Sequence, residues 1–276
     1  MSDARAWKRE DARHHDREAE RYDGLIGREF APYQATHTAE PWARRLAAAG
    51  GRDVLDVGGG TGRTALPVAR AGARVLVLDT SRGMLRVARR KAALSGLDDL
   101  VTVVVGDAER MPFRPCSFDA VVCQGVLHHL PDVGRALAEL DRVLRRGGRL
   151  FLAEPDAAGS LVSRFVRLCA GVARPALRPM LGRSSPAAEH ERPLRATALV
   201  AALRARGYAL RTAHLVHPPY VYRFLPAIVG RVAAAALNRG AAARRSGDIV
   251  VIEGRKPVPR AHDGVPEATA RIGARG

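Results

Sequence analysis

The chain has 276 residues, 47% of them hydrophobic, and a formal net charge of +17. This length suits one α/β domain with additions, and the apolar content is enough for a core. No apolar run approaches the ~18–20 residues of a membrane span and no apolar leader segment is evident, so we expect a cytoplasmic protein. The three cysteines show neither zinc-binding spacing nor a disulfide framework, and we expect no metal site.

The positive charge is concentrated in the second half of the chain. Residues 1–156 contain 25 Lys and Arg against 22 Asp and Glu, whereas residues 157–276 contain 20 against 6. Only three of the 45 basic residues are lysine, and no basic cluster alternates with aromatic side chains. We therefore interpret the charge as compositional bias and expect no nucleic-acid partner. A weak peripheral membrane contact through 160–174 and 221–237 stays open, and the oligomeric state is not indicated.

Charged residues that permit a helix begin the chain, with Trp7 and Tyr22 among the few that could pack against a core. A second helix is expected over 41–49, where Gly50 and Gly51 would end it. The first 50 residues therefore form a helical segment ahead of the first predicted strand.

A glycine-rich stretch at 54–65 organises the rest of the chain. Residues 54–57 predict a short buried strand, four of the next five residues are glycine, and a helix pattern follows. Glycines let the backbone turn tightly and approach a ligand closely, so this is the layout of a nucleotide site. No Gly-Lys-Ser/Thr step follows, which excludes a P-loop. Residues 60–65 also fit the dinucleotide pattern G-x-G-x-x-A, and an ordinary glycine-rich turn is the third interpretation.

The next two predicted strands are also followed by acidic residues. Asp79 ends the strand 74–79 and lies 17 residues beyond Gly62, near the spacing at which an acid meets ribose hydroxyls. The alternative role, capping of the helix 81–93, can be filled by Thr80 or Ser81 instead. The third strand, 101–105, leads directly to Gly106 and Asp107.

Two further strands complete the alternating part of the sequence. The fourth, 117–123, is followed by Gln124 and the pair His128-His129, and a helix is predicted over 133–144 with Gly147-Gly148 as its end. The fifth, 149–153, ends at Glu154. Strands that alternate with helices predict a parallel, doubly wound sheet with ligands at the carboxyl ends of its strands.

Two motifs resemble class I S-adenosylmethionine (SAM)-dependent methyltransferases. The run Asp56-Val-Gly-Gly-Gly-Thr-Gly62 is similar to their first motif, and Gly106-Asp-Ala-Glu-Arg-Met-Pro-Phe113 matches their adenine-side loop, which a dehydrogenase does not need. The resemblance covers about residues 15–156 and points to the small-molecule group that includes quinone-biosynthesis and natural-product enzymes. It implies SAM as cofactor, a small-molecule acceptor, and a seven-stranded, mostly parallel sheet with a helical cap insertion.

The resemblance also implies roles for individual residues. Asp79 would bind the ribose, Asp107 the adenine amino group, Met84 would flank the adenine, and Tyr22 could close over the cofactor. The alternative for Asp107 is a turn aspartate that bonds its own backbone. The full candidate set for the cofactor is Tyr22, Asp56, Gly58, Gly60, Gly62, Asp79, Thr80, Met84, Asp107, Ala108 and Gln124.

Two adjacent histidines are the candidates for acid–base chemistry. His128 and His129 would lie beside the reactive methyl group, where a neutral imidazole can take a proton from an acceptor. Glu154 could orient either a histidine or the substrate. The alternative is that both histidines only pack at the turn before Pro131, and the sequence does not separate the two.

We expect five segments along the chain: a helical lid at 1–50, a SAM-binding core at 51–155, a cap at 156–196, the rest of the sheet at 197–256, and a disordered tail at 257–276. The fourth segment includes a helix at 224–237 and a last, antiparallel strand at 247–253. Two other functions remain. A nucleic-acid methyltransferase would favour Asn/Asp-Pro-Pro-Tyr where Gln124-Gly-Val-Leu stands. The second is a non-catalytic SAM- or dinucleotide-binding protein.

Overall fold

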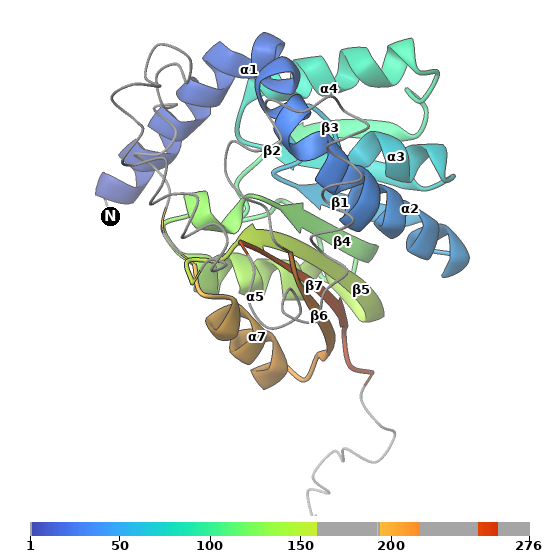
Figure 1. The fold of residues 1–276 in the computed structure, drawn as a ribbon, viewed down its shortest axis with the longest axis vertical. Coiled ribbons are helices and arrows are strands. Elements are labelled where there is room, and N and C mark those ends of the chain that lie inside the picture. The colour runs from blue at the N-terminus through green and yellow to red at the C-terminus, as the bar shows by residue number, and fades with distance from the viewer. Residues whose placement is uncertain (1, 159–191, 193, 216–247, 259–276) are drawn as a thin grey trace, which may run out of the picture.

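The computed structural model describes residues 2–158, 192, 194–215 and 248–258. These residues form a seven-stranded sheet between two layers of helices, with the N-terminal helix laid along one of them (Figure 1). The helices are α1 (Ser2–His37), α2 (Ala39–Ala48), α3 (Ala65–Arg70), α4 (Arg82–Leu94), the short 3₁₀ helix η1 (Leu127–His129), α5 (Val133–Val143) and α7 (Ala196–Ala205). The strands are β1 (Asp53–Val57), β2 (Arg74–Asp79), β3 (Val101–Val105), β4 (Phe118–Gln124), β5 (Leu144–Pro155), β6 (Ala209–Leu215) and β7 (Ile249–Arg255).

The strand order β3-β2-β1-β4-β5-β7-β6 confirms the predicted doubly wound, mostly parallel sheet. Strands β1 to β5 are parallel, and β7 runs antiparallel to both of its neighbours, as expected for the last strand. The chain moves outward from β1 to β2 and β3, then returns to place β4 on the other side of β1. Such a reversal opens a crevice at the carboxyl ends of the strands, where ligands bind in this class of sheet.

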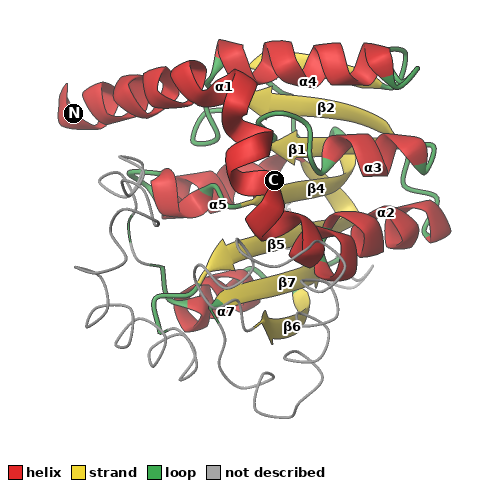
Figure 2. Ribbon diagram, turned by 45° about the horizontal axis from the view of Figure 1, so that its top comes forward, coloured by secondary structure: helices red, strands yellow, loops and turns green. Residues whose placement is uncertain are grey.

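Each face of the sheet has its own apolar core. Helices α2, α3 and α4 cover one face, where Trp42 is completely buried and its ring lies 5.5 Å from that of Phe151. Helices α5 and α7 cover the other, with Leu140 and Leu203 buried there (Figure 2). The central strands are therefore buried on both faces, which explains why their segments of the sequence are apolar almost throughout.

The junction between α5 and β5 differs from the prediction. The helix predicted over 133–144 ends at Val143, but the strand predicted from 149 begins at once, with Leu144 paired to Phe118 of β4. A Cβ at Gly148 would lie 2.9 Å from the carbonyl oxygen of Asp119. These glycines therefore permit close strand contact rather than ending a helix.

Helix α1 docks on the start of α4 through one carboxylate and a small apolar contact. Asp16 Oδ1 accepts hydrogen bonds from Ser81 Oγ at 2.7 Å and from the Gly83 amide at 2.6 Å. Ala19 packs beside Met84. An acid at a helix N-terminus satisfies unpaired amides and complements the helix dipole, so Asp16 holds α1 against this end of α4.

Several predictions lie outside the described residues, namely most of the cap, the helix at 224–237, and the tail beyond 258. Within the described part, no helix combines the length and apolarity needed to cross a membrane. The same residues contain no group of three or more His, Cys, Asp or Glu side chains that could hold a metal ion.

Candidate active site

A cavity lies at the carboxyl ends of the central strands and is closed on one side by α1. Its empty volume is about 800 Å³ including the open mouth, within the range of small-molecule sites. Nine of the eleven predicted cofactor residues line it: Tyr22, Gly58, Gly60, Asp79, Thr80, Met84, Asp107, Ala108 and Gln124. Of the three predicted catalytic residues, only His129 does so.

The glycine turn after β1 forms the floor of this cavity. Gly58 and Gly60 have φ angles of 62° and 53°, a region that favours glycine. A Cβ at Gly58 would also lie 2.3 Å from Val126 Cγ2, whereas one at Gly60 would meet nothing within 4 Å. Gly58 is therefore required by packing against the loop after β4, and Gly60 leaves its backbone open to the cavity.

Asp79 ties this turn to the loop that starts α4. Its Oδ2 accepts from the Gly60 amide at 2.9 Å and its Oδ1 from the Ser81 amide at 2.8 Å. Burial raises the pKa of Asp79, while these two amides oppose the rise. Ser81, not Asp79, caps α4, because its hydroxyl accepts from the Met84 amide at 3.1 Å. Each carboxylate oxygen has a second lone pair, so Asp79 can still accept from a ligand hydroxyl.

Asp107 uses one oxygen for its turn and the other for a contact with α1. Its Oδ1 accepts from the Glu109 amide at 2.9 Å, and its Oδ2 accepts from Lys8 Nζ at 2.7 Å. Lys8 Nζ also lies 2.6 Å from Glu109 Oε2. Burial alone would lower the pKa of Lys8, but the two carboxylates raise it overall. The ammonium of Lys8 thus bonds to the oxygen that was predicted to face an adenine amino group.

Glu154 contacts His128 and does not line the cavity. Its carboxylate is completely buried. Oε1 accepts from the amides of Val126 and Leu127, each at 2.9 Å, and Oε2 lies 2.8 Å from His128 Nδ1. Since a carboxylate can only accept, this contact assigns the His128 proton to Nδ1. Glu154 therefore orients both the turn at η1 and the His128 ring.

His129 is the histidine that faces the cavity. Its Nδ1 lies 3.4 Å from Asp11 Oδ1, and the ring of His15 packs edge-on at 5.6 Å between centroids. Trp7 Nε1 donates to the His129 carbonyl oxygen at 2.9 Å. Helix α1 thus places three polar side chains against His129, and one of them is the carboxylate of Asp11.

Asp56 and Gly62 lie outside the cavity lining and shape the turn behind it. Asp56 is buried, and its Oδ2 has no hydrogen-bond partner among the described residues. Burial, with added repulsion from Asp79, raises the pKa of Asp56 to about 7. The Gly62 carbonyl accepts from the Leu66 amide at 3.0 Å, at the start of α3. Asp56 and Gly62 were predicted to bind the cofactor, but the structure places both behind the turn rather than in the cavity wall.

The sequence interpretation missed the residues that α1 contributes. Lys8, Asp11 and His15 line the cavity, but they belong to a charged helix whose docking no local pattern indicates. Val126 and Leu130 line it too, and their proximity to Gln124 and His129 along the chain is a signal that could have included them.

Comparisons with known proteins agree with this geometry. Residues 55–152 match the family described as a methyltransferase domain. A demethylmenaquinone methyltransferase from Thermobifida fusca is 45% identical over 142 residues, which are 49% of this chain and 57% of the relative. The chain thus spans only a little over half the length of that relative.

Solved structures share the fold over more of the chain. A SAM-dependent methyltransferase from Thermotoga maritima has a TM-score of 0.57 and 23% identity, over 88% of this chain and 99% of that one. The cyclase SpnF has a TM-score of 0.54 and 26% identity, over 80% and 82% of the two chains. The segment 55–152 is therefore similar to the methyltransferase-domain family, and the sheet has the fold of class I methyltransferases.

Proposed function

We propose that this chain is a SAM-dependent methyltransferase that acts on a small molecule. The observation that supports it most is the cavity at the carboxyl ends of β1 to β4, lined by the glycine turn, Asp79 and Asp107 within the methyltransferase segment 55–152. The ends of three strands bring hydrogen-bond acceptors and accessible backbone to the same cavity, which is what binding of a nucleoside requires.

The residues present fit SAM. Asp79 offers acceptors for two ribose hydroxyls, and Asp107 offers one for the adenine amino group once Lys8 gives way. Met84, whose side chain is 1% exposed, supplies an apolar flank for a base. The open backbone at Gly60 allows a ligand to approach closely.

When bound, SAM supplies a methyl group already activated by a sulfonium, so the protein has mainly to align the acceptor. Alignment at about 3–3.5 Å between reacting atoms provides much of the rate gain. We assign His129 as the residue that takes a proton from the acceptor, because it lines the cavity and has Asp11 beside it. His128 and Glu154 act as positioning residues behind it.

The names of similar proteins suggest which acceptors to test first. The Thermobifida relative is named for demethylmenaquinone, so quinone-type acceptors are the first class to test. Similarity to SpnF, which is named as a cyclase, supports a second candidate, an enzyme of the same fold that catalyses a cyclisation.

The cofactor can be tested without knowledge of the acceptor. Isothermal titration with SAM should give binding and titration with NAD should not. Asp79→Ala, with circular dichroism to confirm folding, should weaken SAM binding by about 10–150-fold, the usual cost of losing a charged acceptor. Unchanged SAM affinity in a folded Asp79→Ala variant would remove the ribose assignment.

The reaction needs a transfer assay. Radiolabelled methyl transfer from SAM to a panel of reduced quinones should give labelled product. His129→Ala should lower the rate by about 10²–10⁴-fold at saturating SAM, while SAM affinity is retained. SAM binding with no transfer to any acceptor would contradict methyl transfer and favour the cyclase alternative. Equal losses in His128→Ala and His129→Ala would contradict the assignment of His129 alone.

A further inference from the structure

The outer side of α1 carries a row of arginines. Arg5, Arg9, Arg13, Arg17 and Arg21 follow one another at intervals of four residues, and all five side chains are exposed. Residues four apart are neighbours on a helix surface, so these charges form a band along α1. Lys8, Asp11 and His15 of the same helix line the cavity, and the five arginines do not.

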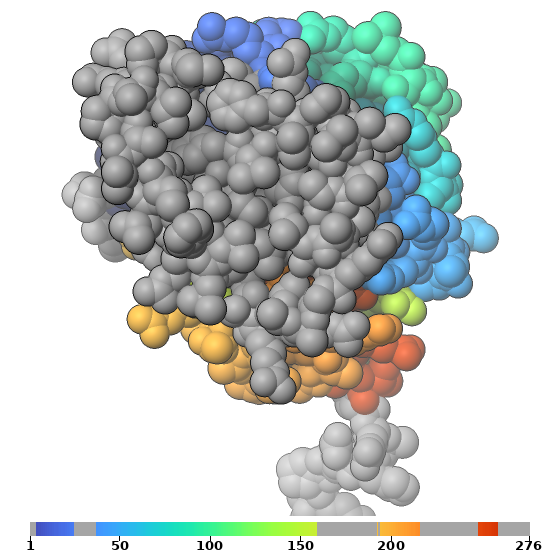
Figure 3. Space-filling model, in the orientation of Figure 1, coloured from blue at the N-terminus to red at the C-terminus, as the bar shows by residue number. Residues whose placement is uncertain are grey.

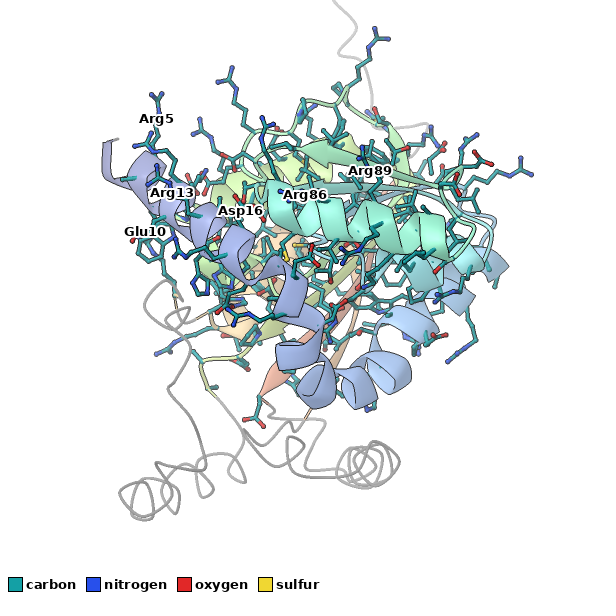
Figure 4. All side chains as sticks on the ribbon, turned by 90° about the horizontal axis from the view of Figure 1, so that it is seen from above. Arg5, Glu10, Arg13, Asp16, Arg86 and Arg89 are labelled. Carbon is teal, nitrogen blue, oxygen red and sulfur yellow. The ribbon has the colours of Figure 1, made fainter. Side chains whose placement is uncertain are left out.

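Helix α4 extends this band. It runs beside the middle of α1, as the contacts of Asp16 with Gly83 and of Glu20 with Arg90 show. The α1–α4 arginine face is defined by eight exposed residues: Arg5, Arg9, Arg13, Arg17, Arg21, Arg82, Arg86 and Arg89. Figure 4 looks onto these two helices and shows labelled arginines of both along the same side. In the space-filling view the two helices adjoin at one edge of the molecule (Figure 3).

The acids of α1 neutralise this face only in part, because four of them contact residues other than its arginines. Asp16 accepts from Ser81 and Gly83 at the start of α4, Asp23 bonds to Lys91 at 2.7 Å, Glu20 pairs with Arg90, and Asp11 lies beside His129. None of the eight arginines makes an ion pair with a described residue. Glu10, Asp16 and Glu20 are exposed acids in or beside the face, and its eight arginines outnumber them, so the face is positive although α1 as a whole is nearly balanced.

The chemistry of the face favours lipid headgroups over nucleic acid. Leu94 is 82% exposed and lies four and eight residues beyond Arg90 and Arg86, in the same row of α4. An apolar side chain beside arginines suits a membrane interface. No aromatic side chain among those described is exposed, so the face lacks the stacking groups of a single-strand binder.

We propose that the α1–α4 arginine face docks on the surface of an anionic bilayer. Docking there would hold α1, which closes the cavity, next to the lipid. The inference rests on surface charge and exposure, and it does not depend on methyl transfer. An arginine near an anionic surface contributes roughly fivefold to partitioning, so three of them account for about 100-fold.

The test compares two variants with the same change in net charge. One carries Arg9→Glu, Arg13→Glu and Arg17→Glu. The control carries Arg114→Glu, Arg135→Glu and Arg204→Glu, at exposed sites away from α1 and α4. Each is measured by flotation with vesicles of phosphatidylcholine alone or mixed with phosphatidylglycerol, and circular dichroism confirms that both fold.

We expect the full chain to float with the mixed vesicles and not with phosphatidylcholine alone. The variant in α1 should bind at least about 100-fold more weakly, and the control within a few-fold of the full chain. Equal losses in both variants, or equal binding to both kinds of vesicle, would overturn the proposal. So would tight binding to duplex RNA at physiological salt that the α1 variant alone loses, because the partner would then be a nucleic acid.

Discussion

Replacement of Glu154 should separate its structural contribution from its effect on His128. In Glu154→Ala the buried amide of Leu127, the partly buried amide of Val126 and His128 Nδ1 all lose their acceptor. In Glu154→Gln a side-chain oxygen remains for the two amides, but an N–H now faces His128 Nδ1. The imidazole must then accept at Nδ1, so its proton moves to Nε2.

The two variants should therefore lower the free energy of unfolding by different amounts. An unsatisfied buried donor costs about 1–3 kcal/mol, and three donors with partial access to water suggest about 3–5 kcal/mol for Glu154→Ala. Glu154→Gln keeps every contact and loses only the charge assistance, so about 1–2 kcal/mol is expected. Because His129 still faces the cavity, methyl transfer by Glu154→Gln should fall by no more than about tenfold.

Urea unfolding followed by circular dichroism would measure both costs, and nitrogen-15 chemical shifts of the imidazole would report the His128 tautomer. Glu154→Gln should unfold at a higher urea concentration than Glu154→Ala and show the proton on Nε2. If the two variants are equally unstable, or if the tautomer is unchanged in Glu154→Gln, the contact between Glu154 and His128 does not act as described.

Three further changes test other parts of the site. Because burial raises the pKa of Asp56 from 3.8 to about 7, the folded protein keeps a proton that the unfolded chain loses, and stability should fall as pH rises between these values. Asp56→Asn should remove that decline from urea-unfolding curves, and an unaltered pH profile would contradict the shift. Gly58→Ala should cost about 1–3 kcal/mol and more than Gly60→Ala, since only the first Cβ meets Val126; equal costs in thermal unfolding would argue against that contact. Lys8→Met should strengthen SAM binding by up to about fivefold in titration calorimetry, because a screened ion pair no longer competes for Asp107. Weaker binding would mean that Lys8 assists the cofactor.

Local patterns were enough to predict the core of the fold. Short β-branched runs such as 101–105 predicted strands, and the helix signals predicted both ends of α4 within one residue and left its cap open between Thr80 and Ser81. The alternation of strands with helices then required a parallel sheet, whose ligands bind at the carboxyl ends. Asp79 and Asp107 could therefore be placed beside one cavity from their position along the chain alone. The start of β5 at Leu144 was missed, because pairing with Phe118 overrides the helix-ending glycines.

The acceptor side of the cavity was decided only by tertiary contacts. His128 and His129 are adjacent in sequence, and their rings differ in direction because Glu154, 26 residues away, binds one of them. Lys8 meets Asp107 across 99 residues, through a helix whose own sequence shows only that it is charged. Periodicity predicts which residues form an element and which face of it is apolar. It does not predict where a mostly polar helix docks, because that depends on ion pairs and caps that form only when distant segments fold together.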